Sequence, residues 1–229
     1  MALIVVLPLN KCFPQEKEIK NSEKFVKKAY NFYKNKNYKE AVYYCKMAVN
    51  LDEKDRNAYI LLIDSLMKIG DYKTSAFYIE KLFKFYNSDP DLYYNAGVVY
   101  FKLKEYDKSI EYLNKALEFF PYDVDTLKAL GVVYELLGNY EQAIEKYKMA
   151  LKNSKVKYNL YYDIAFNYFM MGKYESSEKF FKKAIDENKN FAPAYRGLCA
   201  VYSQFGNKKC AKEYLQKSIA IDKSLSKNR

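Results

Sequence analysis

The sequence contains no histidine and no tryptophan, and it is poor in residues that interrupt regular structure, with seven glycines and five prolines among 229 residues. A fold built from many β-turns needs more glycine and proline than this. What the chain does contain is tyrosine and phenylalanine, at 26 and 15 residues, and half of all residues are apolar. This composition favours long helices that are joined by tight turns around a sizeable core.

Residues that carry chemistry are equally scarce. Without histidine the chain lacks the commonest general base and any Ser-His-Asp or Cys-His arrangement, and it has no glycine-rich phosphate-binding motif. The four cysteines, Cys12, Cys45, Cys199 and Cys210, form no C-x-x-C pair. We therefore expect no enzyme activity, no cofactor and no metal. Cys45 and Cys199 fall among apolar or small positions, which predicts two core thiols in a reducing compartment.

Arginine is also rare. The formal charge is +11, from 39 basic and 28 acidic residues, but the only arginines are Arg56, Arg196 and Arg229. Bidentate contacts to phosphates and bases favour the planar fork of arginine. The sequence thus favours a solvated, lysine-coated surface over a nucleic-acid-binding one. Binding of nucleic acid or acidic lipid by lysines near residues 24–36 is the weaker alternative.

A period of 34 residues runs through almost the whole chain. Tyrosine recurs at Tyr38, Tyr72, Tyr106, Tyr140 and Tyr174, with Lys208 in the sixth position. Two residues earlier stand glycines or lysines: Lys36, Gly70, Lys104, Gly138, Gly172 and Gly206. Three residues after the tyrosine every residue is small: Ala41, Ser75, Ser109, Ala143, Ser177 and Ala211. Several columns in one phase, without insertions, indicate a tandem repeat.

Each repeat is predicted to be a pair of antiparallel helices. Tyr161, Ile164, Ala165 and Tyr168 follow the i, i+3, i+4, i+7 spacing of one helical face. The glycine after this helix suits a left-handed C-cap, and an Asp or Asn after the glycine suits the start of a second helix. A helix pair cannot bury its apolar face alone. Stacking of successive pairs buries it and builds a solenoid.

These columns resemble the tetratricopeptide-repeat family, most clearly through Gly97, Tyr100, Tyr106, Ala116 and Pro121, and through Gly131, Tyr134, Gly138, Tyr140, Ala143 and Ala150. The resemblance implies an all-α fold, a right-handed superhelical α-solenoid of antiparallel helix pairs. Lys28, Lys36 and Lys208 depart from the pattern in the terminal repeats, whose outer sides face water. We expect an apolar, then lysine-rich segment at 1–21, a short tail at 226–229, and six repeats at 22–55, 56–89, 90–123, 124–157, 158–191 and 192–225.

In the family that the chain resembles, the first helices line a concave groove that holds a peptide or a helix of a partner. A second apolar stripe on these helices, continued in the fourth repeat by Val132 and Leu136, would face that groove. The expected partner-binding residues are Tyr30, Tyr33, Ile60, Met67, Tyr94, Val98, Phe101, Lys128, Tyr162, Phe166, Phe169, Met170 and Arg196. The predicted function is a scaffold or adaptor that binds an apolar or amphipathic segment of another protein.

Two alternatives remain open for this stripe. Tight curvature would bury it between neighbouring first helices. Self-association would consume it, together with an apolar edge on the last helix at Leu215, Ile219 and Ile221, and would make the chain a structural homodimer. The two-carboxylate clamp of chaperone-tail adaptors is not expected, because Lys128 and Arg196 are two repeats apart with Tyr162 between them.

The apolar run at residues 2–9 is too short to span a bilayer, and no basic stretch precedes it. We expect residues 1–20 to fold back as a plug or cap on a cytoplasmic protein. The alternative is a membrane-tethered lipoprotein assembly factor that is acylated on Cys12.

Overall fold

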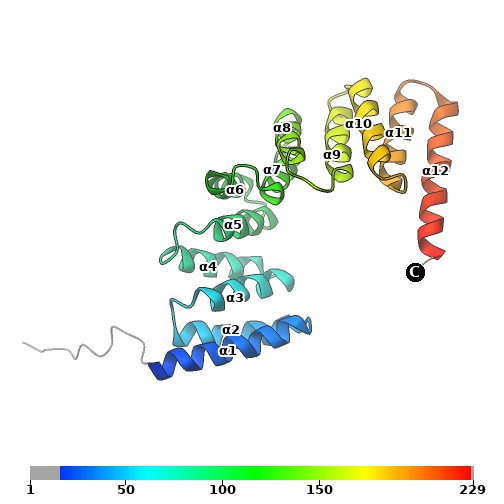
Figure 1. Ribbon diagram of the computed structural model, residues 1–229. Coiled ribbons are helices and arrows are strands. Elements are labelled where there is room, and N and C mark those ends of the chain that lie inside the picture. Colours follow the sequence, from blue (N-terminus) through cyan, green and yellow to red (C-terminus); the bar gives the residue numbers. More distant parts are fainter. Residues whose placement is uncertain (1–15, 228–229) are drawn as a thin grey trace, which may run out of the picture. The chain divides into compact units, whose positions relative to one another are not determined.

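A computed structural model describes residues 16–227, and it contains twelve α-helices and no strand in that range. The helices follow one another in antiparallel pairs (Figure 1), which confirms the predicted all-α fold. Their bounds are α1 (Glu16–Lys34), α2 (Tyr38–Leu51), α3 (Arg56–Lys68), α4 (Tyr72–Phe83), α5 (Pro90–Lys102), α6 (Tyr106–Phe119), α7 (Val124–Leu136), α8 (Tyr140–Leu151), α9 (Tyr158–Met170), α10 (Tyr174–Glu187), α11 (Ala192–Gln204) and α12 (Lys208–Lys227).

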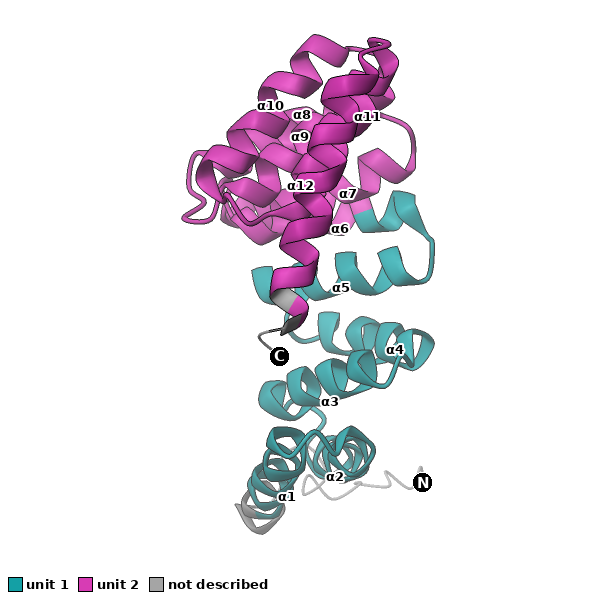
Figure 2. Ribbon diagram, turned by 90° about the vertical axis from the view of Figure 1, so that its right-hand side faces the viewer, with its two compact units in different colours: residues 1–109 teal, residues 110–229 magenta. Residues whose placement is uncertain are grey.

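The chain divides into two compact units, residues 1–109 and 110–229, with the boundary inside α6 (Figure 2). In the first unit α1 packs on α2, α2 on α3, α3 on α4 and α4 on α5. The second unit repeats this order from α7 to α12. First helices of successive pairs also touch, as α1 touches α3 and α9 touches α11. Each helix therefore packs both on its partner within the pair and on the neighbouring pair, as expected for a stacked array.

Every first helix ends in the same way. The six residues of the glycine–lysine column all have positive φ, including Lys36 at 59° and Lys104 at 63°. The next residue donates its backbone N–H to the carbonyl five residues earlier, for example Asp71 to Leu66 at 2.9 Å and Asn139 to Tyr134 at 2.8 Å. This is the hydrogen bond of a Schellman C-cap. The predicted left-handed cap is thus present, and two lysines adopt it as well as the glycines.

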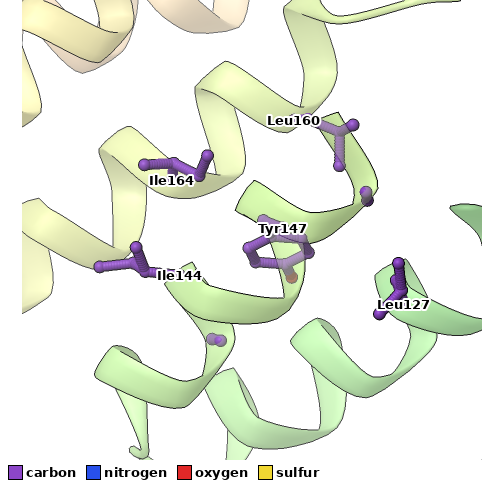
Figure 3. Close-up of a cluster of buried hydrophobic side chains, with 7 residues drawn as sticks. Leu127, Ile144, Tyr147, Leu160 and Ile164 are labelled. Carbon is purple, nitrogen blue, oxygen red and sulfur yellow. The ribbon is translucent and has the colours of Figure 1, made fainter. Parts of the chain in front are cut away.

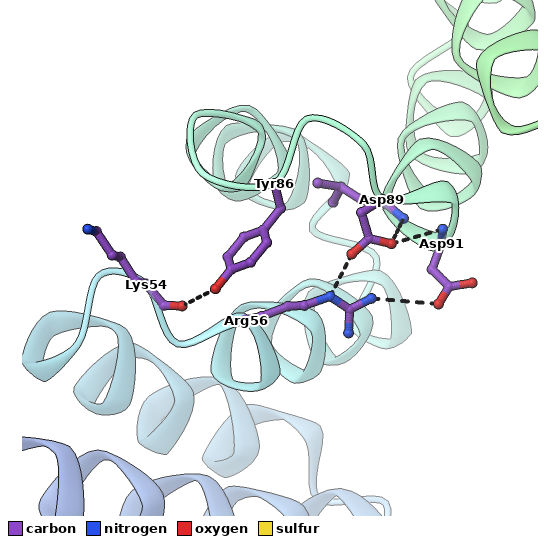
Figure 4. A network of polar contacts seen from close by, with 6 residues as sticks. Lys54, Arg56, Tyr86, Asp89 and Asp91 are labelled. Carbon is purple, nitrogen blue, oxygen red and sulfur yellow. Dashed lines mark hydrogen bonds and ion pairs between the residues drawn. The ribbon is translucent and has the colours of Figure 1, made fainter. Parts of the chain in front are cut away.

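Aspartates mark the starts of three first helices in succession. Asp55, Asp89 and Asp123 each accept backbone N–H groups of the following turn, at distances of 2.8 to 3.3 Å. Asp89 also accepts the Arg56 Nε at 2.6 Å, and the Tyr86 hydroxyl donates to the Lys54 carbonyl at 2.8 Å (Figure 4). In the first unit the Arg56–Asp89 contact ties the second helix pair to the third, and the Tyr86–Lys54 bond joins the loop after α4 to the loop before α3.

The core consists of small residues that face large ones. Ala41, Ser75, Ala143 and Ser177 of the small column are fully buried, and the Ser177 hydroxyl donates to the Ala165 carbonyl at 2.8 Å. In the second unit Figure 3 shows the Tyr147 ring among Leu127, Ile144, Leu160 and Ile164, which come from α7, α8 and α9. Small columns let the helices approach, and large side chains fill the remaining space.

One expectation from the sequence needs correction. Cys45 is a core thiol, and burial raises its pKa to about 12, but Cys199 on α11 is only half-buried. Helix α1 begins at Glu16, inside the segment 1–21, and the residues before it lie outside the described range. The proposed plug and Cys12 otherwise lie outside the described residues. Between residues 16 and 227, no helix is both long and apolar enough to cross a membrane.

Candidate protein-binding face

In the first unit the expected partner-binding residues lie on α1, α3 and α5. Tyr30 is 48% exposed, and the others are half-buried: Tyr33, Ile60, Met67, Tyr94, Val98 and Phe101. The Tyr33 hydroxyl hydrogen-bonds the carboxylate of Asp64, which raises the pKa of Tyr33 to about 12 and links α1 directly to α3. Part of this stripe therefore has a structural role between neighbouring first helices.

In the second unit the stripe combines packing with exposure. Tyr162, Phe166 and Phe169 of α9 are half-buried, while Met170 is 47% exposed. The Tyr162 ring contacts Phe181 and Phe191 at centroid distances of 5.6 and 5.5 Å. On α7, Val132 and Leu136 are exposed, Leu136 by 57%. None of these side chains is fully buried, so apolar surface remains open to solvent on the first helices.

The two basic residues of the expected site lie on different helices and differ in their contacts. Lys128 on α7 reaches Asp125 only at 3.9 Å, and its side chain is 42% exposed. Arg196 on α11 forms an ion pair of 2.9 Å with Asp222 of α12. Arg196 thus contacts α12, and Lys128 has the freer ammonium group.

Sequence reasoning missed a polar group between α7 and α9. This group, which we call the α7–α9 acceptor cluster, consists of Glu135 on α7 and of Asp163 and Asn167 on α9. The Asn167 Nδ2 donates to Glu135 Oε2 at 2.7 Å and to the Asp163 carbonyl at 2.8 Å. The Tyr147 hydroxyl approaches the same Glu135 oxygen at 3.5 Å from α8. Asn167 is fully buried, and its Oδ1 has no hydrogen-bond donor.

Both carboxyl groups of the cluster titrate abnormally. Burial, then the nearby charge of Glu135, raises the pKa of Asp163 from 3.8 to about 7, against a lowering effect of Lys128. Burial also raises the pKa of Glu135, although hydrogen bonds from Asn167 and Tyr147 act in the opposite direction. Perturbed carboxyl groups of this kind gather at functional sites more often than on ordinary surfaces.

A signal for Glu135 was present in the repeat itself. Counting by 34 residues places it in one column with Tyr33, Met67, Phe101, Phe169 and Ser203, so it is an acid where four other repeats carry large side chains and the sixth carries serine. Asp163 interrupts the apolar surface of α9 in the same way. The distance between the two is set by how neighbouring pairs stack, which the period alone does not define.

The comparisons with known proteins agree with this architecture. The sequence matches family models of the tetratricopeptide repeat over residues 89–155 and 158–191. Residues 34–116 match the model of anaphase-promoting complex, cyclosome, subunit 3. No curated protein is similar enough to the chain to count as a match.

Several solved structures share the fold at low identity. A tetratricopeptide repeat protein from Parabacteroides merdae has a TM-score of 0.76 and 20% identity, and the match covers 88% of this chain and 80% of that one. MamA from Desulfovibrio magneticus has a TM-score of 0.68 and 17% identity over 72% of this chain and 94% of its own. The hetero-tetramer Cut9–Hcn1 of the APC/C contributes a chain with a TM-score of 0.67 and 18% identity, covering 90% of this chain and 40% of that one.

Proposed function

Because this chain is a tetratricopeptide-repeat protein, we propose that it is a non-enzymatic scaffold that binds an apolar or amphipathic segment of another protein on the face of its first helices. Solenoids offer long surfaces of this kind, and an amphipathic helix or extended peptide recognises them through a few apolar anchors. That Cut9 and Hcn1 form a hetero-tetramer in a solved complex is consistent with such a role.

The observation that carries the proposal is the partly open apolar stripe of the second unit. Phe166 and Phe169 are half-buried, and Leu136 and Met170 expose about half of their side chains. A soluble chain that leaves aromatic and aliphatic side chains in one contiguous stripe has a surface suited to a partner. Among residues 16–227 no group of three or more acidic or cysteine side chains is placed to hold a metal ion.

The proposal is tested by comparing variants of the full chain in the capture and direct binding of a partner protein. Phe166→Ala and Phe169→Ala, alone and combined, are expected to weaken binding by at least about tenfold, because interface aromatics contribute more than about 1 kcal/mol each. Leu136→Ser with Met170→Ser should also weaken it, and these exposed positions leave the core untouched. Phe120→Ala, at an exposed aromatic that follows α6, is the matched control.

Thermal unfolding of the same variants separates a binding surface from a core. The proposal expects the Leu136→Ser and Met170→Ser chain to keep its Tm and lose binding. If that chain binds its partner as the unaltered protein does, the first-helix face is not the docking surface. If Phe166→Ala and Phe169→Ala reduce Tm sharply and reduce binding only in proportion, the stripe acts as core.

Self-association is a second candidate function, and it is favoured by a different surface. Leu215 and Ile219 on α12 are 42% and 44% exposed, although α12 is the longest helix of the array. Exposed aliphatic residues four apart form an edge on which a second copy of the chain could pack. Light scattering after size exclusion tests this role: a dimer that becomes a monomer in Leu215→Lys with Ile219→Lys supports it, and a monomeric unaltered chain excludes it.

A further inference from the structure

We propose that the α7–α9 acceptor cluster is the site on this face that receives a cationic side chain of the bound segment, the ammonium of a lysine or the guanidinium of an arginine. This inference rests on the proposed function and gives the partner a chemistry: an apolar segment that carries a basic residue between its apolar anchors. Glu135 on α7 and Asp163 on α9 would contact the cation, and Asn167 would hold Glu135 in place.

The first argument is a surplus of acceptors. The Asp163 carboxylate has no hydrogen bond or ion pair within the described part of the chain. Glu135 accepts from Asn167 at 2.7 Å through a single oxygen, Oε2, which it shares with the more distant Tyr147 hydroxyl. The Asn167 Oδ1 is buried without a donor. Buried acceptors that lack donors are rare in folded proteins, and a group that brings several N–H donors would satisfy them.

The second argument is charge. Two carboxylates from neighbouring first helices repel each other in a partly dry site, and a cation between them replaces this repulsion by two attractions. Lys128 does not supply that cation, because its ammonium group lies nearest to Asp125, on the same helix. The chain has a formal charge of +11 and is rich in lysine, so the pair of acids at the α7–α9 acceptor cluster differs in charge from the rest of the protein.

The third argument is the apolar frame around the cluster. Val132 and Leu136 lie on α7 beside Glu135 in sequence, and Phe166 and Met170 lie on α9 beyond Asp163. Equivalent positions to Glu135 carry Tyr33, Met67, Phe101 and Phe169 in other repeats, so only one level of the array offers an acid there. A basic residue within an apolar segment would therefore fix the register in which the segment binds.

Binding of a cation here depends on pH. The titratable groups around Asp163 are Lys128 and Glu135 on α7, Tyr147 on α8 and Tyr162 on α9. Arg196 on α11 acts on Tyr162. Asp163 itself is the group whose pKa burial and the charge of Glu135 raise to about 7. Because the cation binds the ionised carboxylate, affinity should rise between pH 6 and pH 8 as Asp163, with a pKa of about 7, loses its proton.

The test uses the full chain and n-butylguanidinium as the probe, with neutral n-butylurea as its uncharged counterpart. Binding is followed by amide chemical shifts in two-dimensional NMR. We expect saturable shifts at α7 and α9 with a dissociation constant on the order of millimolar, and binding about tenfold tighter at pH 8 than at pH 6. Asp163→Asn and Glu135→Gln should each weaken binding about tenfold, whereas Glu175→Gln, an equal charge change at an exposed acid of α10, should not.

The inference is overturned if n-butylurea shifts the same amides equally, or if Asp163→Asn binds the probe as the unaltered chain does. Asp163→Asn removes a charge that burial disfavours, so it is expected to fold, and its Tm verifies this in the same samples. If the probe experiment fails but the Leu136→Ser and Met170→Ser chain no longer binds its partner protein, the cation site is wrong and the proposed function is still supported. If that chain keeps its partner, the proposed function fails independently of the probe.

Discussion

At the residue scale the tightest constraint is the contact between Tyr147 and Gly131. A Cβ atom at Gly131 would lie 2.4 Å from the Tyr147 ring, far inside van der Waals contact. Gly197 and Phe181 form a second pair of the same kind, also at 2.4 Å. In these two pairs the absence of a side chain makes room for a large buried ring. Gly131 and Gly197 are therefore packing residues, unlike the glycines of the caps.

Gly131→Ala is expected to destabilise the protein by about 1–3 kcal/mol, because an overpacked core forces the ring or the backbone to move. Urea unfolding measures the loss. Tyr147→Leu in the same chain should recover part of it, since the smaller side chain leaves room for the methyl group, as a double-mutant cycle would show. Additive effects of the two substitutions would contradict the proposed clash.

Asp163 gives the stability of the chain a pH dependence of unusual sign. A carboxyl group whose pKa is raised on folding favours the folded state while it is protonated. This contribution is present below pH 3.8 and is lost as the pH rises to about 7, where the native carboxyl group ionises. Asp163→Asn should therefore raise Tm, and by more at pH 8 than at pH 5. Glu175→Gln is the control, and an equal gain at both pH values would disprove the assignment.

At the scale of single elements, the caps explain why the helix pairs are so regular. Gly70, Gly138, Gly172 and Gly206 adopt φ values of 70° to 79°, and nothing would obstruct a Cβ atom at any of them. The reason for glycine is thus the backbone conformation alone. Lys36 and Lys104 adopt the same conformation with a side chain, which strains the backbone by roughly 1 kcal/mol each.

Lys36→Gly and Lys104→Gly are expected to stabilise the protein by about 1 kcal/mol each, and Gly138→Lys to destabilise it by a similar amount. Thermal unfolding of the three variants measures the effect. Lys36→Gln is the control, because it removes the same charge as Lys36→Gly and keeps a side chain. A glutamine variant as stable as the glycine variant would show that removal of charge, and not the backbone, is responsible.

Helix positions and caps could be predicted from the sequence because both depend on residues close in the chain. The spacing of Tyr161, Ile164 and Ala165 defines one face of α9, and Gly172 defines its end. The division of the second stripe between core and surface could not be predicted. Whether Tyr162 is half-buried depends on Phe181 and Phe191, which reach it only when pairs stack, and the meeting of Glu135 with Asp163 depends on the same stacking.

At the scale of the whole molecule, stability is distributed through contacts between neighbours. Interior helices such as α8 are covered on both sides, with Ala143, Tyr147 and Ala150 buried. α12 packs on α11 and leaves Leu215 and Ile219 exposed. In an array of this kind the terminal pair has the fewest stabilising interfaces. Local opening is therefore expected to be easiest at the C-terminal helix.

Hydrogen exchange should show this gradient directly. Amides of α12 are expected to exchange at least about tenfold faster than those of α8, because their opening needs less apolar surface to be exposed. Mass spectrometry of peptides from both helices measures the ratio. The comparison is made at two protein concentrations, because dimerisation through Leu215 and Ile219 would protect α12 only at the higher one. Equal protection of α8 and α12 in a monomer would contradict the nearest-neighbour account.

The stacking of each helix pair on the next also determines how the second unit would respond to tension. Shear between layers is resisted only at the face where two pairs meet, so a pulling force detaches one pair at a time and does not rupture a single central core. Each detached pair frees 34 residues, a contour length of roughly 11–12 nm at full extension. Such an array can lengthen in steps under load and shorten again as pairs re-stack on their neighbours.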